Sequence, residues 1–167
     1  GKFTGFNNTH TNSGGAAIFI REGSHLNFFD GIVEKCNAAS GGAIYANKEV
    51  ALELTGCVFD GNEAGNAGGA ILSGKTDGQL ITDCTFTDNT AGAFGGAVGF
   101  SAGASSVTLD GCTFTNNTSG RGAAVLVENF CGHCDDIAYH WGNSGSKYTT
   151  IGGLKISDLG KKGFVAN

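Results

Sequence analysis

The residues with the most evident chemical potential lie near the carboxyl end of the chain. Cys131 and Cys134 enclose a Gly-His pair, and Asp135, Asp136 and His140 follow closely. A Cys-x-x-Cys pair can close a local disulfide, bind a metal ion, or carry out thiol–disulfide exchange. Exchange requires the first cysteine at the start of a helix in a thioredoxin-like unit, which the sequence does not predict. We therefore predict a disulfide between the two cysteines, with a metal site that adds His140 or Asp135 as the alternative.

The same segment could supply the acid and base groups of a polysaccharide lyase or hydrolase. Asp135 and Asp136 offer two carboxylates, and His133 and His140 offer two imidazoles. Such enzymes group their carboxylates on one face, together with a basic residue or Ca²⁺. A solvated loop closed by a disulfide explains the same residues. We therefore predict a non-catalytic protein that requires no cofactor and no metal.

A sequence repeat occupies most of the chain before this segment. Gly-Gly-Ala-Ile begins at Gly41 and again at Gly68, and close variants begin at Gly95 and Gly122. These starting positions are 27 residues apart. A related copy begins 26 residues earlier, at Gly15. Regular spacing of this kind is typical of solenoid proteins, in which each repeat stacks on its neighbours.

A second motif, Cys-x-Phe-x-x-Asn, runs in step with the first. Its members are Cys57, Phe59 and Asn62, then Cys84, Phe86 and Asn89, then Cys112, Phe114 and Asn117. We expect Phe6 and Val33 to occupy the phenylalanine position in earlier repeats, and Cys36 to occupy the asparagine position. Trp141 lies 27 residues beyond the last phenylalanine and would continue the row.

Each repeat contains three short runs of alternating apolar residues, separated by Gly, Asn, Asp and Ser. Such runs predict strands and are too short for helices. Three strands and three turns per repeat predict one coil of an all-β, right-handed parallel β-helix. We expect about six coils in a single domain, residues 1–167. Residues 127–150 would form an irregular, cysteine-containing coil, and residues 151–167 the last coil or a cap.

Stacking would place like residues above one another inside the solenoid. The phenylalanines would fill the centre of each coil, and Asn62, Asn89 and Asn117 would form an inward ladder that satisfies backbone groups at the turns. The cysteine row would consist of buried thiols that act as small apolar groups. Bridging between neighbouring coils is the alternative for these thiols, because the strand spacing is within disulfide reach.

Composition limits the environment and the partners. Gly accounts for 30 of 167 residues and Pro is absent, yet hydrophobic residues make up 40% of the chain, enough for a core. The net charge of −5 and the lack of a basic run exclude nucleic acid as a partner. No apolar stretch is long enough for membrane insertion. The even number of cysteines favours an extracellular location.

Surface features add two further expectations. Asn7 and Asn116 begin Asn-x-Ser/Thr acceptor sequences for glycosylation, whereas Asn117 belongs to the inward ladder. Thr-Phe-Thr occurs in the two adjacent repeats at 85–87 and 113–115, as in an ice-binding surface. Other repeats interrupt that array with Val, Ile and acidic residues, so ice binding is a weaker interpretation.

The paired Gly-Gly-Ala-Ile/Val and Phe-x-x-Asn motifs resemble the repeats of the chlamydial polymorphic outer-membrane proteins. The resemblance covers residues 4–125 and is weak in the last forty residues. Proteins of that family are autotransporter adhesins with β-helical passenger domains. The resemblance therefore implies surface exposure and adhesion, and it implies no catalytic site.

The predicted function follows from the ends of the solenoid. The chain begins at Gly1 without Met, which indicates a processed product or an excised piece. No capping helix is evident, and uncapped strand edges invite further pairing. We predict an extracellular structural module that stacks end to end with copies of itself, as a filament or surface layer. A surface adhesin that binds a receptor or glycan is one alternative, and a polysaccharide lyase or hydrolase is the other.

Overall fold

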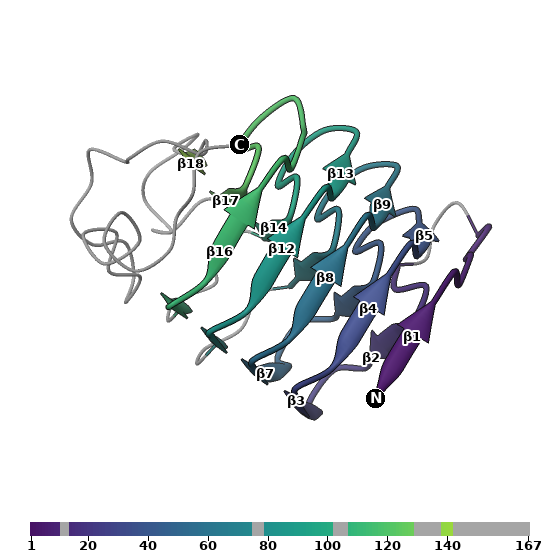
Figure 1. Ribbon diagram of the computed structural model, residues 1–167, viewed down its shortest axis with the longest axis vertical. Coiled ribbons are helices and arrows are strands. Elements are labelled where there is room, and N and C mark those ends of the chain that lie inside the picture. The colour runs from purple at the N-terminus through teal and green to yellow at the C-terminus, as the bar shows by residue number, and fades with distance from the viewer. Residues whose placement is uncertain (11–13, 75–78, 102–106, 129–137, 142–167) are drawn as a thin grey trace.

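Short strands separated by corners repeat along the described chain (Figure 1). The computed structural model describes residues 1–10, 14–74, 79–101, 107–128 and 138–141. Every regular element within these residues is a β-strand, and strands from successive repeats pair to form a solenoid. The predicted all-β, parallel β-helix is therefore confirmed.

Four sheets run along the solenoid and are named here after their characteristic residues. The phenylalanine sheet contains β1 (Lys2–Thr4), β4 (Ile32–Glu34), β8 (Val58–Asp60), β12 (Thr85–Thr87) and β16 (Thr113–Thr115). The short sheet contains β5 (Asn37–Ala38), β9 (Glu63–Ala64) and β13 (Thr90–Ala91). The glycine sheet contains β2 (Ile18–Ile20), β6 (Ile44–Ala46), β10 (Ile71–Ser73), β14 (Val98–Phe100), β17 (Val125–Glu128) and β18 (Ala138–Trp141). The leucine sheet contains β3 (His25–Phe29), β7 (Ala51–Thr55), β11 (Gln79–Thr82) and β15 (Val107–Asp110).

The structure differs from the prediction in the number of strands and turns. A coil contributes to four sheets, not three, because the two-residue strands β5, β9 and β13 are too short to show an alternating pattern in sequence. The leucine sheet has four strands, so the described residues form about four turns instead of six. After β17 the described chain does not add another parallel strand, since β18 pairs antiparallel with β17.

The phenylalanine row forms the centre of the core. Phe59 pairs with Phe86, and Phe86 pairs with Phe114, so all three side chains point inward at the same level. Their rings stack with centroids 5.0 Å and 4.8 Å apart. These distances equal the usual spacing of about 4.8 Å between strands. All three are fully buried, and the outward neighbours Val58 and Asp60 are partly exposed.

Two members assigned to this row by spacing alone lie elsewhere. Phe3, not Phe6, pairs with Val33, because the first coil is three residues longer than the repeat. Phe6 is 48% exposed, with its ring 6.2 Å from that of Phe3. The backbone of Trp141 pairs with Val125 in the glycine sheet, because the chain reverses direction before β18. Both assignments were therefore wrong.

The two glycines of each Gly-Gly-Ala motif have different roles. Gly68 has a φ of +64°, which most residues avoid, and a β-carbon there would overlap the Ile71 carbonyl oxygen. Gly69 lacks a positive φ, but a β-carbon would overlap the carbonyl oxygen of Gly96 on the next coil. Ala123 takes this second position in the coil of β17, beyond which no parallel coil is described. The second glycine is therefore required by close stacking.

We predict that Gly69→Ala destabilises the protein by about 1–3 kcal/mol, because the new methyl group must displace the backbone of the next coil. Gly65→Ala is the matched control, since the nearest atom to its β-carbon lies 3.7 Å away. Urea unfolding followed by circular dichroism measures both midpoints. Equal midpoints for the two variants would contradict close stacking as the reason for the second glycine.

The asparagine row forms a continuous ladder at the corner after the phenylalanine sheet. The Asn89 amide nitrogen Nδ2 donates to the Phe59 carbonyl at 3.0 Å and to Oδ1 of Asn117 at 2.9 Å. Its Oδ1 accepts bonds from the backbone N–H and Nδ2 of Asn62, both at 3.0 Å. The Cys36 backbone N–H donates to Oδ1 of Asn62 at 3.1 Å, so Cys36 occupies the expected position. The ladder satisfies corner backbone groups that the sheets do not reach.

We predict that Asn89→Ala lowers the free energy of unfolding by about 3 kcal/mol or more, since it leaves several buried polar groups without partners. Asn27→Ala is the control, because Asn27 is exposed on the outer face of β3. Chemical denaturation of both variants checks this. A loss below about 1 kcal/mol for Asn89→Ala would show that water replaces the amide.

Candidate functional site

The chemistry predicted from sequence near the carboxyl end falls mostly outside the described residues. This applies to Cys131, His133, Cys134, Asp135 and Asp136. His140 lies in β18, where its backbone pairs with Leu126. The disulfide, the metal site and the acid–base pair at these positions therefore stay predictions.

A different site lies on the outer face of the glycine sheet. The outward positions of β2, β6, β10 and β14 are Phe19, Tyr45, Leu72 and Gly99, aligned by the strand register. The rings of Phe19 and Tyr45 stack with centroids 5.5 Å apart and an interplanar angle of 1°. Phe19 is 49% exposed. The row thus presents a flat aromatic surface followed by a position without a side chain.

This row forms the floor of a groove of about 580 Å³, called here the glycine-sheet groove. Its lining residues are Gly14, Phe19, Ala39, Ser40, Tyr45, Asn47, Asn66, Leu72, Phe94 and Ser101. Gly14 leaves room for the Tyr45 ring, which a β-carbon at that position would overlap. Amide and hydroxyl groups border the aromatic floor, and no lining residue carries a charge.

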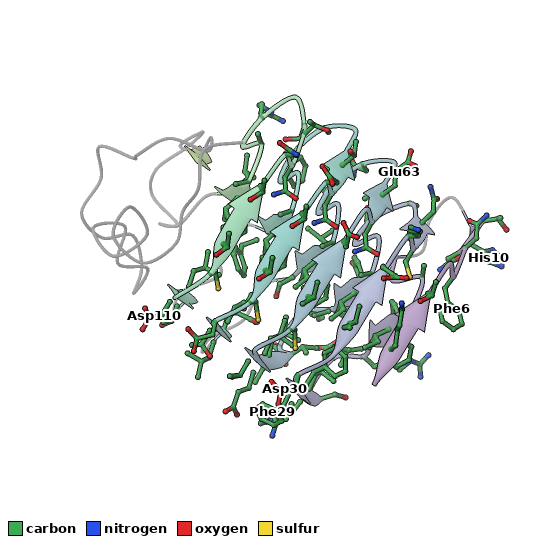
Figure 2. The ribbon with its side chains drawn as sticks, viewed as in Figure 1. Phe6, His10, Phe29, Asp30, Glu63 and Asp110 are labelled. Carbon is green, nitrogen blue, oxygen red and sulfur yellow. The ribbon has the colours of Figure 1, made fainter. Side chains whose placement is uncertain are left out.

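A second hollow of about 640 Å³ adjoins the groove and is called here the amino-terminal hollow. Its lining residues are Asn7, Asn8, Thr9, His10, Asn37, Ala38, Ala39, Glu63, Gly65 and Asn66. Ala39 and Asn66 line both hollows, so the two meet at the corner between the short sheet and the glycine sheet. His10 and Glu63 lie at the outer surface (Figure 2).

The two hollows together suit binding better than hydrolysis. Aromatic rings can contact the apolar faces of a ligand, and side-chain amides both donate and accept hydrogen bonds. Hydrolysis of a glycosidic bond usually requires two carboxylates on either side of the bond. Glu63 supplies the one carboxylate among the lining residues of both hollows.

The described cysteines are free, buried thiols. The adjacent Cys112 thiol raises the pKa of Cys84 to about 12, and the adjacent Cys84 thiol raises the pKa of Cys57 above its ordinary range. Burial raises the pKa of Cys36. These groups are therefore protonated at neutral pH and are poor nucleophiles.

The remaining surface predictions can be placed on the structure. Asn7 and Asn116 are both exposed, whereas the neighbouring Asn117 is 1% exposed within the ladder. Glycosylation at the two exposed asparagines stays a prediction. The outward threonines of β12 and β16 are in register, but β8 places Val58 and Asp60 beside them. The threonine array is thus limited to two coils.

Sequence reasoning missed the aromatic floor because its members differ in type. Phe19, Tyr45 and Leu72 occupy equivalent outward positions, one residue after the last position of each glycine motif. The signal was present as large apolar residues at a position that alternation points to solvent. Phe94, from the corner before Gly95, could be assigned to the groove only from the structure.

Comparison with known proteins identifies the fold. A family model described as a right-handed β-helix region matches residues 1–137. Comparisons with curated proteins and with solved structures found no match. Among the described residues, no helix is long and apolar enough to cross a membrane. The matched description specifies the fold and its handedness, but no ligand and no reaction.

Proposed function

The chain belongs to the right-handed β-helix family, and from its outer surface we propose that it is a non-catalytic extracellular module that binds a neutral glycan. The glycine-sheet groove carries this proposal. Its floor of stacked Phe19 and Tyr45 offers a flat apolar surface of the kind on which sugar rings pack. The repeat's resemblance to adhesins supports the same conclusion.

The polar border of the groove favours a ligand with many hydroxyl groups. Asn47, Asn66, Ser40 and Ser101 provide donors and acceptors on both sides of the aromatic floor. The absence of charge among the lining residues disfavours an anionic or cationic ligand. Because the floor crosses successive coils, an extended oligosaccharide would lie along the solenoid axis.

The proposal is tested by Tyr45→Ala, which removes half of the aromatic pair. We expect the dissociation constant for a neutral oligosaccharide to rise about tenfold, corresponding to about 1.4 kcal/mol. Isothermal titration against a panel of soluble cello-, xylo-, manno- and galacto-oligosaccharides measures this. Phe29→Ala is the matched control, because Phe29 is 51% exposed on β3, away from the groove (Figure 2). Lack of binding to every sugar by the unaltered protein would reject the proposal.

We also propose self-association through the amino-terminal end of the solenoid. The inward residues of the first coil, Phe3, Leu26 and Phe28, are only partly buried, although their counterparts in the next coil are fully buried. A further coil stacked on this end would cover them and pair the edges of β1, β2 and β3. The opposite end is less open, since β18 covers the edge of β17.

The rim proposal predicts that association falls when a charge is placed at the first coil. Phe6→Lys introduces an ammonium beside Phe3, whereas Phe29→Lys places the same charge on a side face. Analytical ultracentrifugation of both variants at high concentration measures the difference. We expect oligomers or fibres of the unaltered chain and of Phe29→Lys, but not of Phe6→Lys. A monomeric unaltered chain would contradict self-association and leave the glycan proposal intact.

A further inference from the structure

Three buried thiols form a column inside the solenoid, and neither proposed function uses it. Cys57, Cys84 and Cys112 each precede one strand of the phenylalanine sheet and are 0%, 1% and 2% exposed. The backbone N–H of Cys57 donates to Sγ of Cys84 at 3.4 Å, so consecutive members of the column are in contact. Sulfur atoms recur from coil to coil near the start of β8, β12 and β16 (Figure 2).

The spacing of the column follows from the fold. Inward side chains in these three coils repeat at the strand spacing, as the ring centroids of the phenylalanine row show at 5.0 and 4.8 Å. Equivalent sulfur atoms two residues earlier in each motif are thus about 4.8 Å apart. Two metal–thiolate bonds of about 2.3 Å placed end to end span about 4.6 Å. The column therefore matches the length of a linear sulfur–metal–sulfur unit.

We propose that two consecutive thiolates of this column bind one soft, monovalent d¹⁰ cation, such as Cu⁺ or Ag⁺, in linear coordination. Thiolate ligands select soft cations over hard ones. Side chains stand perpendicular to the sheet, so each Cβ–Sγ bond is directed across the column axis, as a bent sulfur ligand requires. No group of three or more potential ligands is placed for a metal within the described residues, which agrees with two-coordinate binding.

Binding exchanges protons for the cation. Two neutral thiols and one M⁺ give an S–M–S unit with a charge of −1 and release two protons. The contact between neighbouring thiols disfavours each thiolate alone, as the raised pKa values of Cys57 and Cys84 indicate. A cation between the two sulfurs reverses that repulsion. Affinity therefore increases with pH below the thiol pKa values.

The column can hold one cation at a time. Cys84 is common to both possible pairs, and a sulfur that bridged two cations on a straight axis would need an unfavourable straight angle. Cys57 and Cys112 are two coils apart, about twice the strand spacing, which is too far for a direct pair. Cys36 neighbours Phe6 and Asn62, so it has no thiol partner on either side.

The test is titration of the reduced full chain with Ag⁺ in chloride-free buffer, in a Cys131→Ser/Cys134→Ser background. We expect one tightly bound Ag⁺ per chain and two released protons. Cys57→Ser and Cys112→Ser each leave one pair and should retain the ion. Cys84→Ser leaves no adjacent pair and should weaken binding at least a hundredfold. Cys36→Ser is the matched control and should bind as the background does.

The pattern across variants distinguishes the column from ordinary thiol reactivity. If Cys57→Ser, Cys84→Ser and Cys112→Ser lose silver equally, or if Cys84→Ser retains it, the proposal is wrong. Circular dichroism establishes that each variant is folded. Should Cys84→Ser fail to fold, the double variant Cys57→Ser/Cys112→Ser answers the same question, since it keeps Cys84 but no pair. Retention of one tight Ag⁺ by that double variant would overturn the proposal.

Discussion

Parallel hydrogen bonding between successive coils is the constraint on which the rest of this structure depends. It fixes the residues directly above and below each position, as the pairing of Phe59, Phe86 and Phe114 shows. A side chain inside the solenoid is therefore favourable only if copies of it can stack at about 4.8 Å. Aromatic rings, amides and thiols meet this condition, and each type occupies a column of its own.

The corners show why this constraint selects so few residue types. Strand pairing leaves corner backbone groups without sheet partners, and the asparagine ladder of Asn62, Asn89 and Asn117 supplies those partners from inside. The glycine motif solves a different problem, since its first residue needs a positive φ and its second needs close approach of the next coil. Burial of apolar side chains alone would satisfy neither requirement.

Function is more easily carried where the repeat is least regular. Inward positions repeat almost unchanged, whereas the outward row of the glycine sheet changes from Phe19 to Tyr45, Leu72 and Gly99. That change creates an aromatic surface next to an open position, and neighbouring corners add amides and hydroxyls. A regular scaffold thus positions an irregular outer surface, while the interior thiol column is a product of the regularity itself.

The sequence by itself determined the solenoid, the inward rows of Phe, Asn and Cys, and the two roles of the glycine motif, because register makes like residues recur at a constant interval. It did not determine the four-strand coil, since β5, β9 and β13 are too short to show alternation. It misplaced Phe6 and Trp141, because a longer first coil and a chain reversal change the register without changing the spacing. Only the tertiary structure brought Phe94, Asn66 and Tyr45 to one groove, since they come from different coils and corners.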